Sequence, residues 1–296
     1  MTNGGPPTRL PDQPHHHTTI DTLPRAAIAR PLAFLETIMF NNSNDNQAGS
    51  GQYIIFDCEF TVDRPLYERY RRADPDPAPC RWPMKRVMSA SVMAVSVSGG
   101  QLTVTAFKSF SSKDEDRVLL PFFAFLAERP THKLVTWGGV FTDVHVLRLA
   151  AMEYGLKLPA QLRISDRSRH VHLDLCIALK GGSGDYVHQS EVAARLNLPC
   201  KIAGLASHVA RWANYGDFRS IEHVSEADVV TTGMLLASYL DVQGELLSAK
   251  AAQLAIVNFV RPLRGKARYA AILGNVADRL RREILRELHT WMARVA

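Results

Sequence analysis

The stretch YIIFDCEF, residues 53–60, places two carboxylates at the end of a short apolar run. Its first four residues are β-branched or aromatic, which predicts a buried β-strand over residues 52–58. Side chains two positions apart on a strand share a face, so Asp57 and Glu59 lie on the same side. Interior carboxylates are costly unless a cation compensates them. The pair indicates either a site for Mg²⁺ or Mn²⁺, which prefer oxygen ligands, or a strand that runs into solvent with both acids hydrated.

A third acid follows a second apolar strand. Leu134 and Val135 predict that strand, and the glycines at 138 and 139 predict a permissive turn after it. A helix is expected to begin near Asp143, so this side chain stands at a strand–turn–helix junction and can point into a cleft. The alternative is that Asp143 is only an acid in the first turn of a helix, which the macrodipole favours.

A fourth acid and a histidine occur in EHVSEADVVTTGMLLASYL, residues 222–240. The apolar spacing predicts a helix with Asp228 in its first turn and His223 in the preceding loop. Ser225-x-x-Asp228 is similar to a capping box, which would explain Asp228 without catalysis. In that case His223 would be an ordinary surface histidine.

Taken together and in this order, the three segments resemble the DnaQ-like DEDD superfamily of 3′→5′ exonucleases in its histidine-bearing branch, DEDDh. That family has D-x-E on the first strand, an Asp after a glycine-containing turn, and H-x-x-x-x-D near the end of the domain. The matching positions are Asp57, Glu59, Asp143, His223 and Asp228. The tyrosine branch would need a tyrosine where this chain has Val224. The resemblance covers residues 50–241, with Trp137-Gly138-Gly139 where Asn-Gly is frequent.

The resemblance implies an RNase H-like α/β fold with a mixed central sheet flanked by helices. It also implies two Mg²⁺ or Mn²⁺ ions, with Asp57 bridging both, Glu59 and Asp228 completing the first site, and Asp143 holding the second. His223 would be the general base on the attacking water. The product would be a nucleoside 5′-monophosphate released from a single-stranded or frayed DNA 3′ end.

Further elements follow from periodicity. We expect strands over residues 87–97 and 102–110, with residues 87, 89, 91, 93 and 95 on one face, and a helix over 114–128. A short strand ends at Leu173, and Asp174 begins the next helix as its N-cap rather than as a metal ligand. Residues 190–205 predict a helix, a turn at Pro199 and a second helix.

A basic, proline-rich connection, residues 63–85, replaces the short hairpin expected between the first two strands, and its length indicates an insertion. Arginines and aromatics together suit single-stranded nucleic acid, although a solvated loop has a similar composition. The residues predicted to contact nucleic acid are Arg71, Arg72, Arg81, Trp82 and, on substrate phosphate, Lys201.

Composition bounds the class of protein. The chain of 296 residues is 46% hydrophobic, enough for one sizeable domain, and no apolar run reaches the about 18–20 residues of a membrane helix. No signal peptide is evident, and four scattered cysteines are typical of a reducing cytoplasm. Residues 1–49 are predicted to be mostly disordered. Residues 242–296 are predicted to form a basic helical extension with nine Lys/Arg and three Asp/Glu from residue 261 onward.

Three alternatives to a DNA exonuclease stay open. The same site would serve an exoribonuclease that trims RNA 3′ ends, because DNA and RNA differ here only in how a pocket treats the 2′-OH. A weakly active or inactive scaffold of the same fold would bind nucleic acid without cleaving it. A proofreading or DNA-repair subunit would use its N- or C-terminal extension to bind a protein partner.

Overall fold

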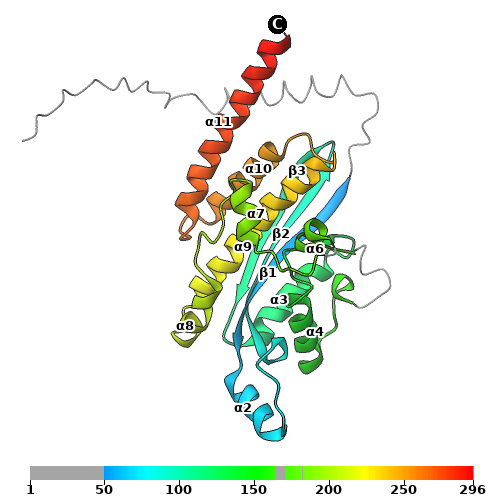
Figure 1. Cartoon of the computed structure of the whole chain (residues 1–296), viewed down its shortest axis with the longest axis vertical. Helices are drawn as coiled ribbons and strands as arrows, with labels where there is room; N and C mark the ends of the chain where they lie inside the picture. The colour runs from blue at the N-terminus through cyan, green and yellow to red at the C-terminus, as the bar shows by residue number, and fades with distance from the viewer. Residues whose placement is uncertain (1–49, 164–170, 182, 296) are drawn as a thin grey trace, which may run out of the picture. The chain divides into compact units, whose positions relative to one another are not determined.

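The computed structural model describes residues 50–163, 171–181 and 183–295 (Figure 1). The predictions for residues 1–49 lie outside this range. A five-stranded sheet in the order β3-β2-β1-β4-β5 forms its centre. The strands are β1 (Gly51–Val62), β2 (Lys85–Ser98), β3 (Gln101–Ser111), β4 (Lys133–Thr136) and β5 (His172–Asp174). Strands β1, β2 and β3 are antiparallel, whereas β4 and β5 run parallel to β1, so the predicted mixed sheet is confirmed.

Helices cover both faces of the sheet. One face packs against α9 (Phe218–Val242), which contacts β1, β2 and β3, and the other packs against α3 (Glu115–Ala127) and α4 (Asp143–Glu153) (Figure 1). Alternate residues of β1 therefore enter two different cores. Ile55 packs on the α9 side, whereas Ile54 and Phe56 pack on the α3–α4 side. Because Asp57 and Glu59 continue the alternation of Ile55, the pattern directs both acids towards α9.

A β-bulge changes one predicted face. The β1–β2 register shifts between Glu59 and Phe60, so that Glu59 faces Ser89 while Phe60 faces Val87. Ser89 and Ser91 contact α9, but Val87 belongs to the core on the α3–α4 side. The expectation that residue 87 shares the face of residues 89–95 is wrong, because a bulge inserts one residue and inverts the alternation beyond it.

The predicted insertion contains a helix. Residues 63–85 form α2 (Arg64–Ala73) and the 3₁₀ turn η1 (Trp82–Met84), which connect β1 to β2. Asp63 caps α2 by accepting from Leu66 N at 2.9 Å, and its own N–H donates to Met84 O at 2.8 Å. No residue of α2 is buried, and Figure 1 shows the helix projecting from one end of the molecule. The insertion is therefore closed at its base and exposed along its length.

The second half of the sheet leads into short helices. These are the 3₁₀ turn η2 (Ala160–Leu162), α6 (Leu175–Lys180), α7 (Gln189–Arg195), the 3₁₀ turn η3 (Ala206–His208) and α8 (Val209–Asn214). The helix predicted directly after Pro199 begins only at η3, because residues 201–205 form a loop in which Lys201 has φ 51° and Gly204 has φ 147°.

The C-terminal helices α10 (Ala249–Leu263) and α11 (Ala270–Val295) form one compact unit with the sheet. Helix α10 packs on α9 and β3, and α11 packs on α10 before projecting beyond the body (Figure 1). Fully buried Glu226 of α9 accepts from Ser109 Oγ at 2.6 Å, Arg264 Nε at 2.5 Å and Tyr269 Oη at 2.8 Å. The residues after 241 are therefore attached to the helix that carries Asp228.

Among the described residues, no helix has the length and apolar character required to cross a membrane. All four cysteines lie in the described range and are free.

Candidate metal centre and nucleic-acid interface

Strand β1 and helix α9 bring three carboxylates together. One oxygen each from Asp57, Glu59 and Asp228 lies within 4.8 Å of the others. Glu59 and Asp228 are buried, and Asp57 is partly buried. Asp57 and Asp228 are 171 residues apart in the sequence, so the convergence of the three acids is a product of the fold and not of local sequence. Asp57 and Glu59 share one face of β1, as predicted. That face is turned towards α9, which supplies Asp228.

The fourth acid reaches the same strand from the other layer. Asp143 is the first residue of α4, and its Oδ1 accepts from Cys58 N at 3.2 Å. This contact is possible because β4 pairs with β1 only from Tyr53 to Ile55. Beyond Ile55, that edge of β1 is open, and the carboxylate of Asp143 takes the place of a neighbouring strand. The predicted strand–turn–helix junction is present.

Lys201 provides a cation inside the cluster. Its Nζ donates to Asp228 Oδ2 at 2.5 Å, whereas Asp228 Oδ1 is buried and has no hydrogen-bond partner within the described part of the chain. Residue 201 adopts φ 51°, a left-handed conformation that is uncommon for a residue with a side chain. Such strain tends to be retained where the surrounding structure needs the side chain in one place.

Burial raises the pKa values of all four acids, and at Asp57 and Glu59 the charges of neighbouring acids add to the rise. The pKa of Asp57 lies well above its usual range because of burial and the charges of Asp228, Glu59 and Asp143. Burial and Asp228 raise the pKa of Glu59 to about 8. Burial also raises the pKa of Asp143 to about 7, against the hydrogen bond from Cys58 N. Four acids in one place with a single lysine in contact lack compensating positive charge.

The donor set fits a hard divalent cation. All candidate ligand atoms are carboxylate oxygens, which suit Mg²⁺ and Mn²⁺, and Asp228 Oδ1 is a buried acceptor without a donor. The cluster is also open on one side, since Asp57 remains partly exposed. A cation there would satisfy the orphaned oxygen and offset the repulsion that raises these pKa values.

His223 is not part of this cluster, contrary to expectation. It lies within α9, which begins at Phe218, and not in a preceding loop; Asp228 likewise lies well inside the helix. Five residues along a helix rotate a side chain by about 140° relative to Asp228. His223 packs edge-on against Tyr269, with ring centroids 6.0 Å apart, and burial lowers its pKa.

The capping-box alternative for Asp228 is also wrong. The N-cap of α9 is Asp217, which accepts from Ser220 N at 3.1 Å. The hydroxyl of Ser225 instead contacts Ser89 Oγ at 2.8 Å and Ser91 Oγ at 2.7 Å. Ser225 therefore fastens the middle of α9 to β2, directly beside the turn that presents Asp228.

Asp174 has the structural role that the sequence predicts. Its side chain caps α6 by accepting from Ile177 N at 3.2 Å. The same carboxylate accepts from Gly138 N at 2.9 Å and Val140 N at 3.1 Å. Asp174 thus ties the turn between β4 and α4 to the start of α6 and helps to fix the position of Asp143.

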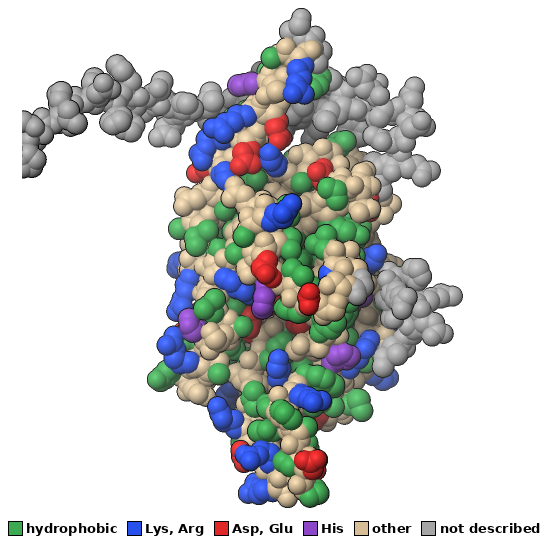
Figure 2. Space-filling view, in the orientation of Figure 1, with side chains coloured by type: hydrophobic (Ala, Val, Ile, Leu, Met, Phe, Trp, Pro, Cys, Tyr) green, Lys and Arg blue, Asp and Glu red, His purple; other side chains and the backbone are tan. Residues whose placement is uncertain are grey.

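The residues predicted to contact nucleic acid lie in two places. Arg71, Arg72 and Arg81 are exposed on the insertion, and Arg71 pairs loosely with Glu68 at 3.7 Å. Trp82 is partly buried and stacks on His145 of α4, with ring centroids 5.2 Å apart. Lys201 lies at the acid cluster instead. Figure 2 shows Lys and Arg side chains gathered around α2 and along α11.

Sequence reasoning missed the loop that borders the cluster. Trp137 Nε1 donates to Val187 O at 3.1 Å, and the ring of Tyr186 lies against Gly138. The unusual Trp-Gly-Gly at residues 137–139 is a signal that could have directed attention here. Nothing in the local sequence of residues 183–188 singles out Tyr186.

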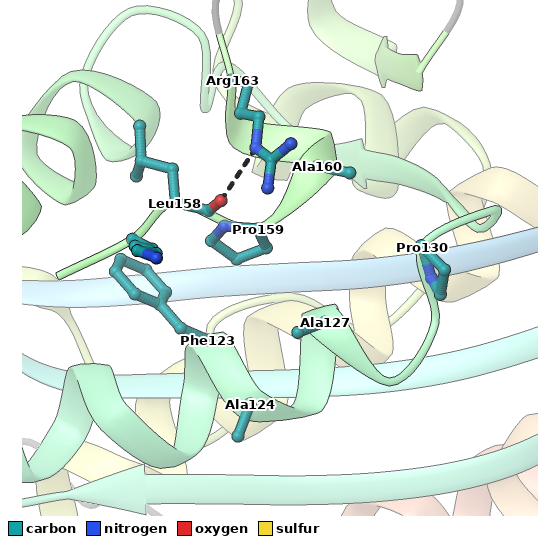
Figure 3. Close-up of a pocket in the computed structure, with 9 residues that line it drawn as sticks. Phe123, Ala124, Ala127, Pro130, Leu158, Pro159, Ala160 and Arg163 are labelled. Carbon is teal, nitrogen blue, oxygen red and sulfur yellow. Dashed lines mark hydrogen bonds between the residues drawn. The ribbon is translucent and has the colours of Figure 1, made fainter.

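A separate cavity of about 330 Å³ lies between α3 and residues 157–163 (Figure 3). Phe123, Ala127 and Leu158 contribute to its apolar lining, and Arg163 Nε donates to Leu158 O at 3.1 Å beside it. None of the four acids lines this cavity, so it does not belong to the cluster.

Residues 80–267 match a family described as a predicted 3′–5′ exonuclease related to the exonuclease domain of PolB. Asp143 and Asp228 lie inside the match, whereas Asp57 and Glu59 precede it. No curated protein matches the chain. Among solved structures, the chain is similar to a family B DNA polymerase from Pyrobaculum calidifontis, at 18% identity and TM-score 0.46, over 75% of this chain and 29% of that one.

The chain is also similar to product-bound exonuclease I, at 9% identity and TM-score 0.34, over 62% of this chain and 46% of that one. It therefore spans less than a third of the polymerase and less than half of exonuclease I. The family match covers more than half of the chain and includes two of the clustered acids. This chain belongs to the family of predicted 3′–5′ exonucleases related to the exonuclease domain of PolB.

Proposed function

We propose that this protein hydrolyses single-stranded or frayed DNA from the 3′ end and releases nucleoside 5′-monophosphates. The observation that carries the proposal is the convergence of Asp57, Glu59 and Asp228, with ligand oxygens within 4.8 Å and one buried oxygen of Asp228 without a partner. Asp143 adjoins this group through Cys58. Burying so many carboxylates costs free energy that a purely structural role does not offset.

In the proposed reaction, two Mg²⁺ or Mn²⁺ ions are held by Asp57, Glu59, Asp143 and Asp228. When bound, the metals supply an activated water and charge stabilisation for the transferred phosphate. Lys201, whose ammonium donates to Asp228, would contact a phosphate oxygen of the bound 3′ end. His223, predicted as the general base, packs its ring edge-on against Tyr269, and its role on the attacking water stays a prediction.

The exposed arginines of the insertion extend the proposed interface. Arg71, Arg72 and Arg81 carry positive charge at exposed positions of the insertion, where they can contact the phosphates of a single strand. Trp82 contributes by holding the insertion against His145 of α4. The preference for DNA over RNA, a role in DNA repair, a protein partner on the C-terminal helices and a cytoplasmic location remain predictions of the proposal.

The decisive experiment measures mononucleotide release from 3′-labelled single-stranded DNA and RNA of equal sequence, with Mg²⁺, Mn²⁺ or EDTA. We expect metal-dependent shortening of DNA that Asp57→Ala abolishes. Glu128→Ala is the matched control, because it deletes an exposed carboxylate on the opposite layer. Faster shortening of RNA would make the protein an exoribonuclease. Binding of both strands without shortening of either would contradict the proposal and favour the scaffold.

A further inference from the structure

The loop between α6 and α7 holds an exposed tyrosine beside the acid cluster. Tyr186 is 54% exposed, yet its loop is fastened on both sides. On one side, Trp137 Nε1 donates to Val187 O at 3.1 Å. On the other, Gln189 Nε2 donates to Thr232 Oγ1 of α9 at 2.7 Å. The loop thus spans from the β4–α4 turn, which presents Asp143, to the helix that presents Asp228.

The β4–α4 turn is shaped to receive the phenol. Gly138 has φ 70°, and a Cβ atom there would lie 3.2 Å from both Tyr186 Cε2 and Tyr186 Oη. The hydroxyl edge of the ring therefore rests on the glycine backbone, where a side chain would push it away. Phe141, from the same turn, meets the ring edge-on with centroids 6.4 Å apart. Two residues of one turn, Gly138 and Phe141, therefore fix the direction of the ring.

The phenol lies within electrostatic reach of Asp143 and Lys201. Burial raises the pKa of Tyr186, as do Cys176, Asp143 and Asp174, while Lys201 opposes the rise. The phenol consequently keeps its proton at neutral pH and acts as a donor. Within the described part of the chain, its hydroxyl donates to no other residue, so the donor is available to a ligand at the cluster.

Helix α9 does not provide an equivalent group. Val224, one turn before Asp228, is a buried aliphatic residue, and His223 faces Tyr269. The positive charges that act on the acids come from Lys201 and Lys85. Tyr186 therefore adds a neutral hydrogen-bond donor to a site whose other side chains are acids and lysines.

We propose that the Tyr186 hydroxyl donates a hydrogen bond to a non-bridging oxygen of the scissile phosphate; this inference rests on the proposed function. In the reaction, the oxygen of water bonds to phosphorus as the bond from phosphorus to the preceding 3′ oxygen breaks. One proton of the water ends on that 3′ oxygen, and Tyr186 keeps its own proton throughout. Because negative charge on the phosphate oxygens redistributes in the transition state, a fixed donor there acts mainly on kcat.

The test compares Tyr186→Phe with the wild-type chain on 3′-labelled single-stranded DNA in Mg²⁺. We expect kcat to fall by about 10- to 100-fold while KM changes by less than about twofold, with an unchanged unfolding temperature. The control is Tyr215→Phe, which removes the hydroxyl of a tyrosine that is 81% exposed at the end of α8 and should leave kcat as in the wild type.

A second variant checks that the position of the hydroxyl matters. Trp137→Phe removes the indole donor that anchors Val187, so the loop should loosen and kcat should fall by less than in Tyr186→Phe. In the Tyr186→Phe background, Trp137→Phe should then cause little further loss, since both act through one hydroxyl. Additive losses would contradict a shared role.

Binding separates a hydroxyl role from base stacking. With thymidine 5′-monophosphate and Ca²⁺, Tyr186→Phe should bind within about twofold of the wild type, and Tyr186→Ala should bind no more than a few-fold more weakly than Tyr186→Phe. Full kcat in Tyr186→Phe, or a loss confined to KM in Tyr186→Ala, would overturn the inference. An inactive wild-type chain would instead overturn the proposed function, so the two failures are distinguishable.

Discussion

Lys201 Nζ lies 2.5 Å from Asp228 Oδ2, so the acid cluster contains its own cation before any metal binds. The lysine comes from a loop residue in left-handed conformation, and its side chain is about one-third exposed, at 34%. It therefore both offsets the repulsion among the acids and competes with an incoming metal for Asp228.

Replacing Lys201 with Met should separate these two effects. Removing the ammonium leaves Asp228 available and makes the cluster more negative, so Mn²⁺ affinity is expected to rise several-fold. Activity should fall by about 10- to 100-fold, because the contact with substrate phosphate is lost. Calorimetric titration with Mn²⁺ beside single-turnover cleavage would measure both. Weaker Mn²⁺ binding would mean that the lysine orients Asp228 instead of competing for it.

Asp57→Asn tests the cost of gathering the acids. The amide is almost isosteric, but it removes one of four like charges that raise each other's pKa. In EDTA we expect the variant to be more stable than the wild type by about 1–2 kcal/mol, a common trade between stability and function. Saturating Mg²⁺ should raise the unfolding temperature of the wild type and leave that of the variant nearly unchanged. Equal stabilisation of both chains would show that the metal binds elsewhere.

The insertion is expected to govern binding of long substrates. Arg71→Ala with Arg72→Ala should weaken single-stranded DNA binding and reduce the slope of log affinity against log salt by about 1.4, for two lost phosphate contacts. Cleavage of a dinucleotide, which offers a single internucleotide phosphate, should be unaffected. Arg117→Ala, an exposed arginine on α3, is the control. An unchanged salt slope would remove the insertion from the interface.

Glu226→Gln should loosen the C-terminal helices. The carboxylate is fully buried and pairs with Arg264, so its neutralisation leaves a charged guanidinium without its partner. We expect a loss of about 3 kcal/mol in the free energy of unfolding, measured in urea. Glu287→Gln, which removes an exposed partner of Lys250, should cost less than about 0.5 kcal/mol. Equal effects of the two changes would contradict the structural role of Glu226.

His172 should make stability depend on pH. Burial lowers its pKa to about 4, and its Nε2 contacts Thr136 Oγ1 at 2.8 Å. Above pH of about 6.5 the imidazole is neutral in both states; as pH falls from there towards 4, only the unfolded chain gains the proton. Stability from this group is therefore lost on acidification. The difference in free energy of unfolding between His172→Gln and the wild type, measured in urea, should shift by about 1–2 kcal/mol in favour of the variant when the pH is lowered from 7.5 to 4.5. A constant difference would exclude this linkage.

The sheet was predictable because its strands carry their own signals. The apolar run before Asp57 identifies β1, and alternation identifies β2 and β3 with the glycine turn between them. Asp143 and Asp174 were placed correctly because strand–turn–helix junctions have local signatures. These features depend on a few consecutive residues, which is the information a single sequence holds.

The errors concern long-range packing. The sequence pattern predicts the start of α9 too late, because Ser225 resembles an N-cap residue. In the structure the hydroxyl of Ser225 instead contacts those of Ser89 and Ser91. That shift also changed His223 from a loop residue to one that faces Tyr269. The position of Tyr186 depends on Trp137 and on the missing side chain at Gly138, some 50 residues earlier. No local pattern reveals such contacts.

The network around Glu226 has a practical consequence for protein engineering. A shortened form that ends at residue 241, the last residue of the motif-bearing region identified in the sequence, would lack Arg264 and Tyr269. It would then expose a buried carboxylate two residues before Asp228 on the same helix. A portable version of this domain for fusion to other proteins should therefore retain the chain at least through Tyr269.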